Sequence, residues 1–152
     1  MAPTAIADLP IGTPARPNTR GMRLAGRVLS ALVIAFFLLD GGIKLVPLQP
    51  VVDTMQHLGW PTDAGTLRTL GIMMLAMMAL YAHPRTALLG AILMTGYLGG
   101  AIATHVRIGS PLFSHILFGA YVGVAVWAGL WLRQPHLRAL LPFTHTTRGE
   151  HP

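Results

Sequence analysis

The sequence contains no cysteine, and only 11% of its 152 residues are charged. Without cysteine, the chain has no disulfide, no thiolate metal site, no iron–sulfur cluster and no dithiol redox chemistry. Soluble domains carry about 25% charged residues, whereas hydrophobic residues make up 53% of this chain and its mean hydropathy is +0.57. We therefore expect a membrane protein of one domain.

Motifs of self-contained catalytic sites are also missing. The sequence has no G-x-x-x-x-G-K-[ST] loop, no G-x-G-x-x-G turn and no H-E-x-x-H pair. Methionine is abundant between Met73 and Met78, and we interpret these thioethers as packing residues rather than as a copper site. We predict no catalytic residue and no metal site. An enzymatic role would be at most that of a quinone-linked oxidoreductase subunit.

Four hydrophobic runs dominate the sequence. They lie at residues 24–46, 64–82, 86–106 and 112–132. Each is close to the roughly 20 residues that cross a bilayer core as a helix. Short turns such as His83–Arg85 connect the later runs, so the predicted fold is all-α: an antiparallel bundle of four transmembrane helices.

The segments outside these runs differ in character. Residues 1–21 are rich in proline and small residues, and we predict a disordered N-terminal tail there. The predicted membrane domain spans residues 22–142, and residues 143–152 form a C-terminal tail. Val51–Leu58 is short and partly amphipathic, which is typical of a helix at the membrane surface, and Trp60 suits the headgroup level.

The arginines predict the orientation. Most of them precede the first run, follow the fourth, or lie between the second and third: Arg16, Arg20, Arg23, Arg27, Arg85, Arg133, Arg138 and Arg148. The other side holds only Arg68 and Arg107 among the arginines, near Asp53 and Asp63. The positive-inside rule then places both termini in the cytoplasm of a multi-pass protein in a bacterial inner membrane. This asymmetry explains the net charge of +6, and we expect no nucleic-acid partner.

Polar residues of all four runs fall near the outer interface, because a helix rises about 1.5 Å per residue. These residues are Asp40, Lys44, Arg68, His105, Arg107 and His115. Charged side chains inside a bilayer usually pair with each other or face the bundle interior. Asp40 and Lys44 lie four residues apart on one helix face. They can lock the helices as an ion pair, alone or with Arg68, or they can serve a ligand or a proton.

The end of the third run carries further candidate chemistry. His105 can exchange protons or bond a carbonyl such as that of a quinone, and Arg107 can clamp an anion, but both can equally be interfacial anchors. Tyr97 and Thr104 share a helix face and can line a cavity toward His105. The candidate cofactor site therefore comprises Asp40, Lys44, Tyr97, Thr104, His105 and Arg107, with Arg68 and His115 nearby. Its candidate cofactor is a quinone.

The same run contains the small-residue pattern G-x-x-x-G, formed by Gly96 and Gly100. Such a pattern allows the backbones of two membrane helices to approach closely. We interpret it as internal packing within the bundle. The alternative is a contact between copies of the chain in a homo-oligomer.

Several stretches resemble one family. GYLGGAIATHVRIGSPL, HILF and WAGLWLRQPHLRALLP, together with HPRTALLGAILMTGYLGG and DGGIKL, are similar to the DoxX-like family of small four-helix integral membrane proteins. The resemblance covers residues 22–142 and is most specific over residues 84–111. The family is named for a subunit of a thiosulfate:quinone oxidoreductase, so the resemblance implies a supporting role in membrane redox or stress systems. The family's second helix usually carries a glutamate where this chain has Met74, and a polar site built on that glutamate would be altered here.

Three functions stay open at this stage. The first is an accessory subunit of a quinone-linked redox system, with a partner membrane or periplasmic redox protein. The second is a non-enzymatic membrane scaffold or assembly protein, and the third is a small-molecule transporter. A closed, fully packed polar cluster would favour the scaffold. A pocket open to lipid beside His105 would favour a lipophilic cofactor, and a water-filled path through the bundle would favour transport.

Overall fold

The computed structural model describes residues 20–46 and 48–140, and the regular elements in these ranges are all helices. They are α1 (Arg20–Leu45), α2 (Gln49–His57), α3 (Ala64–Ala82), α4 (Ala87–Arg107), the π-helical turn η1 (Leu112–Ile116), α5 (Leu117–Arg133) and α6 (Pro135–Leu140). Among the described residues, four apolar segments are long enough to cross a membrane, namely α1, α3, α4 and the combined η1–α5, which confirms the predicted four-span, all-α fold. The predicted tails lie outside the described residues, except that Arg20 and Gly21 already belong to α1.

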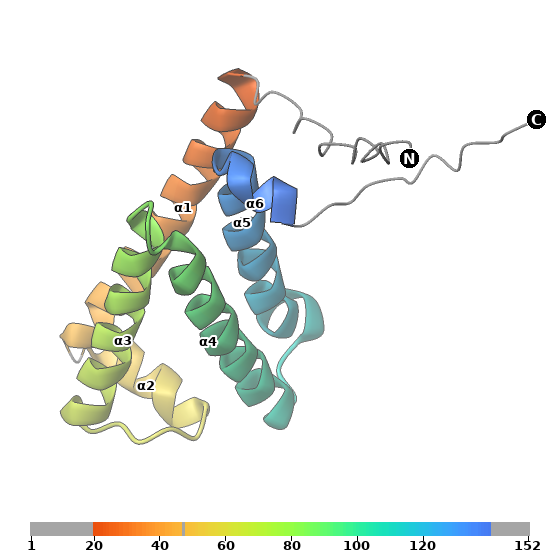
Figure 1. Cartoon of the computed structure of the whole chain (residues 1–152). Helices are drawn as coiled ribbons and strands as arrows, with labels where there is room; N and C mark the ends of the chain where they lie inside the picture. The colour runs from red at the N-terminus through yellow and green to blue at the C-terminus, as the bar shows by residue number, and fades with distance from the viewer. Residues whose placement is uncertain (1–19, 47, 141–152) are drawn as a thin grey trace, which may run out of the picture.

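The four long helices form a ring in which α1 and α4 each pack against both α3 and α5. α1 begins and α5 ends at the upper end of the molecule in Figure 1, and we call this the termini end. α2 lies at the opposite end, near the start of α3 and the end of α4, and we call this the α2 end. The α1–α3 pair and the α4–α5 pair meet near the termini end and diverge toward the α2 end (Figure 1).

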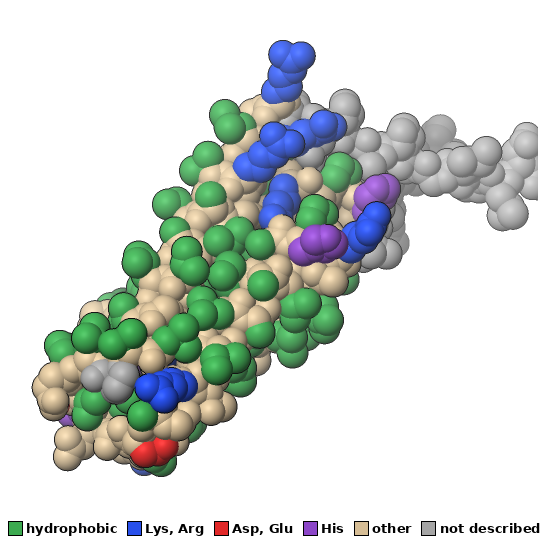
Figure 2. Space-filling model, turned by 90° about the vertical axis from the view of Figure 1, so that its left-hand side faces the viewer, with side chains coloured by type: hydrophobic (Ala, Val, Ile, Leu, Met, Phe, Trp, Pro, Cys, Tyr) green, Lys and Arg blue, Asp and Glu red, His purple; other side chains and the backbone are tan. Residues whose placement is uncertain are grey.

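The surface indicates a lipid bilayer as the surrounding medium. On the face shown in Figure 2, hydrophobic side chains cover the middle of the molecule, while Lys and Arg side chains gather at the upper end. Leu32, Leu39 and Leu89 are 63%, 69% and 50% exposed. Apolar exposure of this extent is uncommon on soluble monomers and marks a membrane or interaction surface.

Local sequence signals explain where α3 begins. Asp63 is its N-cap, and the carboxylate accepts hydrogen bonds from the backbone N–H of Thr66 at 2.9 Å and from the Thr66 hydroxyl at 2.7 Å. The bond from the Thr66 side chain is the main reason why the pKa of the Asp63 carboxyl lies below its usual range. The turns that precede α3 and η1 contain Gly59 and Gly109 at φ of 71° and 68°, a left-handed conformation that favours glycine.

Isolated glycines let the helices approach most closely. A Cβ built on Gly90 of α4 would lie 2.3 Å from the backbone nitrogen of Tyr81 in α3. One on Gly129 of α5 would lie 2.7 Å from the Ser30 hydroxyl oxygen in α1, and one on Gly26 of α1 would lie 2.8 Å from the α5 backbone. Any larger residue at these positions would therefore push the helices apart.

The G-x-x-x-G pattern of α4 does not make such a contact. Within the described part of the chain, no neighbouring atom lies within 4 Å of a Cβ built on Gly96, Gly99 or Gly100. The prediction that Gly96 and Gly100 serve internal packing is therefore wrong, because no described helix packs against this face of α4. A contact with a second copy of the chain through Gly96 and Gly100 stays a prediction.

A buried polar network joins α1, α3 and α5 in the termini half of the bundle. Tyr81 is fully buried; its hydroxyl donates to the Val126 carbonyl at 2.8 Å and lies 3.2 Å from the Ser30 hydroxyl oxygen. Arg133 donates to the Tyr81 carbonyl at 2.6 Å, and its guanidinium carbon lies 4.5 Å from the centre of the Tyr81 ring. Since polar groups inside a bilayer must find protein partners, this network holds the three helices in register.

Candidate functional site

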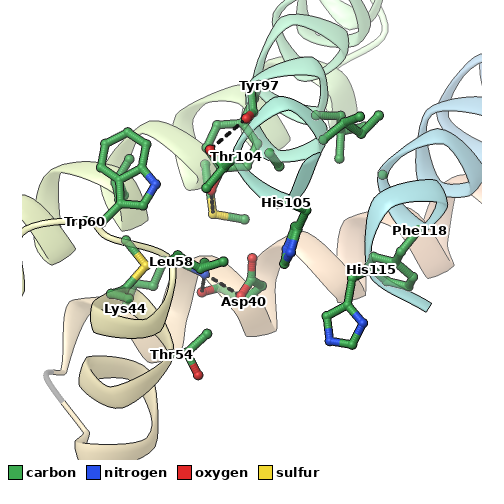
Figure 3. Close-up of a pocket in the computed structure, with 18 of the residues that line it drawn as sticks. Asp40, Lys44, Thr54, Leu58, Trp60, Tyr97, Thr104, His105, His115 and Phe118 are labelled. Atoms are coloured by element: carbon green, nitrogen blue, oxygen red, sulfur yellow. Dashed lines mark hydrogen bonds and ion pairs between the residues drawn. The ribbon is translucent and has the colours of Figure 1, made fainter. Parts of the chain in front are cut away.

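A cavity of about 480 Å³ lies between the diverging helix pairs at the α2 end. Its walls come from α1, α2, the loop that follows α2, α3, α4, η1 and α5 (Figure 3). The volume lies within the range of about 300–1,000 Å³ that is typical of small-molecule sites. Phe37 and Met74 line the cavity and are almost fully buried, and the buried Met94 and Val126 fill the core of the bundle.

The charged part of the wall is the pair Asp40 and Lys44, both on α1. The Lys44 ammonium forms an ion pair with the Asp40 carboxylate and also donates to the Asp40 backbone carbonyl at 3.3 Å. The Asp40 side chain is 31% exposed and the Lys44 side chain 12%. Arg68 takes no part in this pair; its guanidinium donates to the Leu45 carbonyl at 3.4 Å, outside the cavity lining. Because both charges belong to one helix, the ion pair does not lock two helices together.

Tyr97 of α4 lies on the cavity wall, where its hydroxyl donates to the thioether sulfur of Met74 in α3 at 3.1 Å. Its ring meets the Phe37 ring edge-on at a centroid distance of 6.5 Å. Sulfur is a weak acceptor, so the phenol proton has a poor partner inside a pocket. The neighbouring Thr104 donates to the Gly100 carbonyl of its own helix at 2.9 Å, and the lone pairs of its hydroxyl are left to the cavity.

Two histidines stand where α4 ends and η1 begins. Nδ1 of His105 lies 2.9 Å from the Ser110 hydroxyl oxygen, and Nδ1 of His115 lies 2.7 Å from that of Ser114. The two rings meet edge-on with centroids 5.4 Å apart. Figure 3 shows the His105 ring pointing into the cavity toward Asp40. His115 is carried by a π-helical turn, a feature that frequently marks functional sites.

The loop between α2 and α3 forms a roof over the cavity, to which it contributes Leu58 and Trp60. Arg107, at the end of α4, donates to the Leu58 carbonyl at 2.6 Å. A Cβ on Gly59 would lie 2.9 Å from a guanidinium nitrogen of Arg107, so the side chain rests directly on this loop. Arg107 thus holds the roof and is not part of the lining.

The structure brings most of the predicted site residues together. Asp40, Lys44, Tyr97, Thr104 and His105 all line one cavity, and so does His115, whereas Arg68 and Arg107 lie outside its lining. The sequence did not indicate the apolar part of the cavity wall, which consists mainly of Phe36, Phe37, Met55, Met73, Leu98 and Phe118. Their residue types carry no signal in helices that are apolar throughout. Trp60 was expected at the membrane surface and was not expected to line the site.

The arrangement can bind and orient an amphiphilic molecule. The lining offers an ammonium, a carboxylate, a phenol, hydroxyls and imidazole nitrogens, and its other side chains are mainly aromatic and aliphatic. Among the described residues, no group of three or more His, Cys, Asp and Glu side chains is placed to hold a metal ion. The side chains present can donate hydrogen bonds and exchange protons, and electron transfer would require a bound carrier.

Comparison with known proteins gives a match to one family model. Curated proteins and solved structures show no match to this chain. The model of the DoxX-like family matches residues 28–129. This segment contains α3, α4 and every residue of the cavity wall, together with α1 from Val28 onward and α5 as far as Gly129. The chain therefore belongs to the DoxX-like family, as the resemblance indicated.

Proposed function

We propose that this protein binds a lipophilic molecule with a carbonyl- or hydroxyl-bearing head group of the quinone type. It would serve as an accessory subunit of a quinone-linked redox system in the membrane. The observation that carries the proposal is the hydrogen bond of Tyr97 to the sulfur of Met74 on the cavity wall. A carbonyl oxygen is a stronger acceptor than a thioether, so an incoming head group would gain the phenol proton without breaking a strong bond.

The other residues of the cavity fit the same ligand. Lys44 can donate to a second carbonyl, and His105 keeps Nε2 for the ligand while Nδ1 contacts Ser110. The rings of Phe37 and Phe118 offer edges and faces to a planar head group. A bound quinone would supply the electron-carrying chemistry. The residues of this chain would bind it, orient it and, at His105, exchange a proton with it.

The proposed orientation puts the α2 end on the outer side of a bacterial inner membrane and the termini in the cytoplasm. The arginines at the termini end support it, because cytoplasmic ends of membrane helices carry an excess of Lys and Arg. The cavity would then open at the level of the outer headgroups. A partner membrane or periplasmic redox protein would meet the molecule at this end.

Two alternatives, a scaffold and a transporter, have less support. A scaffold needs no cavity of about 480 Å³ with polar groups on its wall. A transporter needs a path through the bundle, whereas Tyr81, Val126 and Leu130 are fully buried and close-packed in the termini half. We therefore favour the binding of a ligand that enters and leaves at the α2 end.

The test is native mass spectrometry of the protein purified in mild detergent, with extraction and identification of the lipids that co-purify. Wild type should retain a quinone, and Tyr97→Phe and His105→Ala should each retain about five- to ten-fold less, the effect of losing one hydrogen bond. His83→Ala, at an exposed histidine of the turn between α3 and α4, is the matched control and should behave as wild type.

Two results would overturn the proposal. One is a wild-type protein that retains no quinone even when quinone is added to the membranes before extraction. The other is equal retention in wild type, Tyr97→Phe and His105→Ala, which would place any bound quinone elsewhere on the molecule. A stoichiometric partner protein that survives in all variants without quinone would favour the scaffold.

A further inference from the structure

A second concave surface lies at the termini end, away from the cavity. It is an apolar groove of about 550 Å³ between the first turns of α1 and the last turn of α5. Its floor consists of Gly21, Leu24, Ala25, Val28, Leu29, Leu32 and Leu132. Leu24, Val28 and Leu32 follow one another at four-residue spacing, so they form a continuous stripe along one helix face. A groove of this shape can accept an extended hydrocarbon chain.

Guanidinium groups stand at the end of the stripe. Arg20, Arg23 and Arg27 all lie in the first two or three turns of α1, with Arg20 one helical turn before Leu24, and all three are exposed. Within the described part of the chain, the one ion pair joins Lys44 to Asp40, and the guanidinium groups of these three arginines have no hydrogen-bond partner. Their charges therefore have to be balanced by groups outside the described part of the protein.

The described acidic residues cannot balance them. Asp40 lies in the second half of α1, Asp53 lies on α2 and Asp63 is the N-cap of α3. All three belong to the α2 half of the molecule, whereas Figure 2 shows Lys and Arg side chains gathered at the opposite, upper end. The described part of the termini end is thus uniformly basic and lies directly beside an apolar groove.

We propose that this end binds an anionic phospholipid from the membrane leaflet at the termini end. The phosphodiester would lie against Arg20, Arg23 and Arg27, and one acyl chain would lie along the stripe of Leu24, Val28 and Leu32. Guanidinium groups match phosphate oxygens in geometry and charge, and clusters of basic residues next to a membrane helix attract anionic lipids. A soluble phosphate would use the arginines but leave the groove empty.

The experiment is native mass spectrometry of the full chain in detergent with equimolar phosphatidylglycerol and phosphatidylcholine of identical acyl chains. Wild type should retain the anionic lipid preferentially. Arg27→Gln should lower this preference about five-fold, the usual effect of one basic residue near a membrane surface, and the triple Gln variant at Arg20, Arg23 and Arg27 should abolish it. Arg68→Gln, at the α2 end, is the matched control and should leave the preference unchanged.

A groove variant tests the acyl chain separately. Ala25→Trp fills the groove, so it should lower retention of both lipids. Glycerol phosphate, which has the head-group charge without acyl chains, should not displace the bound lipid. Raising the salt concentration should reduce the wild-type preference, because exposed charges are screened, and this measurement needs no variant.

The proposal fails under any of three outcomes. The first is an equal retention of the two lipids by wild type. The second is a triple variant that keeps the wild-type preference, or an Arg68→Gln variant that loses it. The third is displacement by glycerol phosphate, which would identify a site for soluble phosphate and remove the role of the groove.

Discussion

Replacing Arg107 by glutamine should open the roof of the cavity. The guanidinium donates to the Leu58 carbonyl at 2.6 Å and thereby joins α4 to the loop that carries Trp60. A hydrogen bond to a charged group contributes about 1.5–3 kcal/mol when it is shielded from water. Arg107 is exposed, so we expect about 1 kcal/mol at this position. This corresponds to about a five-fold larger fraction of molecules with an open roof.

Hydrogen–deuterium exchange measures this fraction directly. The amides of Gly59 and Trp60 donate to the carbonyls of Gln56 and Met55 at 2.9 Å each, so they are protected only while the loop keeps its conformation. In Arg107→Gln these two amides should exchange about five times faster, while amides in α5 should keep their wild-type rates. A proposed ligand in the cavity should also dissociate faster from this variant.

A substitution in the loop itself, at Gly59, tests the same contact between Arg107 and the loop. Gly59→Ala puts a Cβ 2.9 Å from a guanidinium nitrogen of Arg107 at a residue whose φ is 71°, a conformation that costs an alanine about 1–2 kcal/mol. It should therefore open the roof at least as much as Arg107→Gln. Arg68→Gln, which loses only a 3.4 Å bond to Leu45, is the control. Unchanged loop exchange in Arg107→Gln, or equal acceleration in Arg68→Gln, would refute the reasoning.

Three further predictions concern packing and capping. Gly90→Ala should destabilise the bundle by about 1–3 kcal/mol, because its Cβ would lie 2.3 Å from the Tyr81 backbone nitrogen. Gly96→Ala is the control: its Cβ has no described neighbour within 4 Å, so the midpoint of SDS-induced unfolding should stay unchanged. Tyr81→Phe should lower the free energy of unfolding by about 1 kcal/mol and so lower that midpoint, since a buried hydroxyl bond between helices is lost; an unaltered midpoint would contradict this. Because the pKa of Asp63 is lowered in the folded protein, the ionised carboxylate stabilises the start of α3 at neutral pH. This stabilisation is lost when the pH falls below the usual pKa of a carboxyl group and through the lowered pKa of Asp63. The protection of the Thr66 amide, measured against the exchange rate of an unstructured amide at the same pH, should fall in that acidic range, and Asp63→Ala should remove this change.

The membrane spans could be predicted from the sequence because they depend on composition and length. A run near 20 apolar residues becomes a helix in a bilayer whatever its neighbours are, and the predicted and observed bounds of the second span coincide at 64–82. The expected depth of the polar residues in the membrane follows from the fixed rise of a helix per residue. For this reason Asp40 and Lys44 of the first span and His105 of the third were expected at one depth, and in the structure all three line one cavity.

Rotation of each helix about its axis could not be predicted in the same way. The G-x-x-x-G pattern of Gly96 and Gly100 fits a close helix contact, but no atom of another described helix lies within 4 Å of a Cβ built on either glycine, and Gly100 borders the cavity. The closest approaches occur instead at glycines elsewhere in the bundle, such as Gly90 and Gly129. Which face of an apolar helix turns inward depends on its packing against all neighbouring helices. These contacts cannot be deduced from the pattern of one sequence.

The distribution of these glycines also accounts for the cavity. Gly26 and Gly129 bring α1 and α5 together in the termini half, while Gly41 holds α1 close to α3 and Gly119 holds α5 close to α4 in the α2 half. The close glycine contacts of the α2 half are thus within the two helix pairs. Between the pairs, longer side chains such as Tyr97 and Phe37 meet instead, and they border an open space. A cavity made in this way is bordered by helices that are fixed elsewhere, so substitutions on its wall should change ligand binding with little change in stability. The same comparison separates a binding site from a packing defect: at Tyr97→Phe we expect reduced ligand retention with an unfolding midpoint close to that of wild type, whereas Tyr81→Phe should show the reverse.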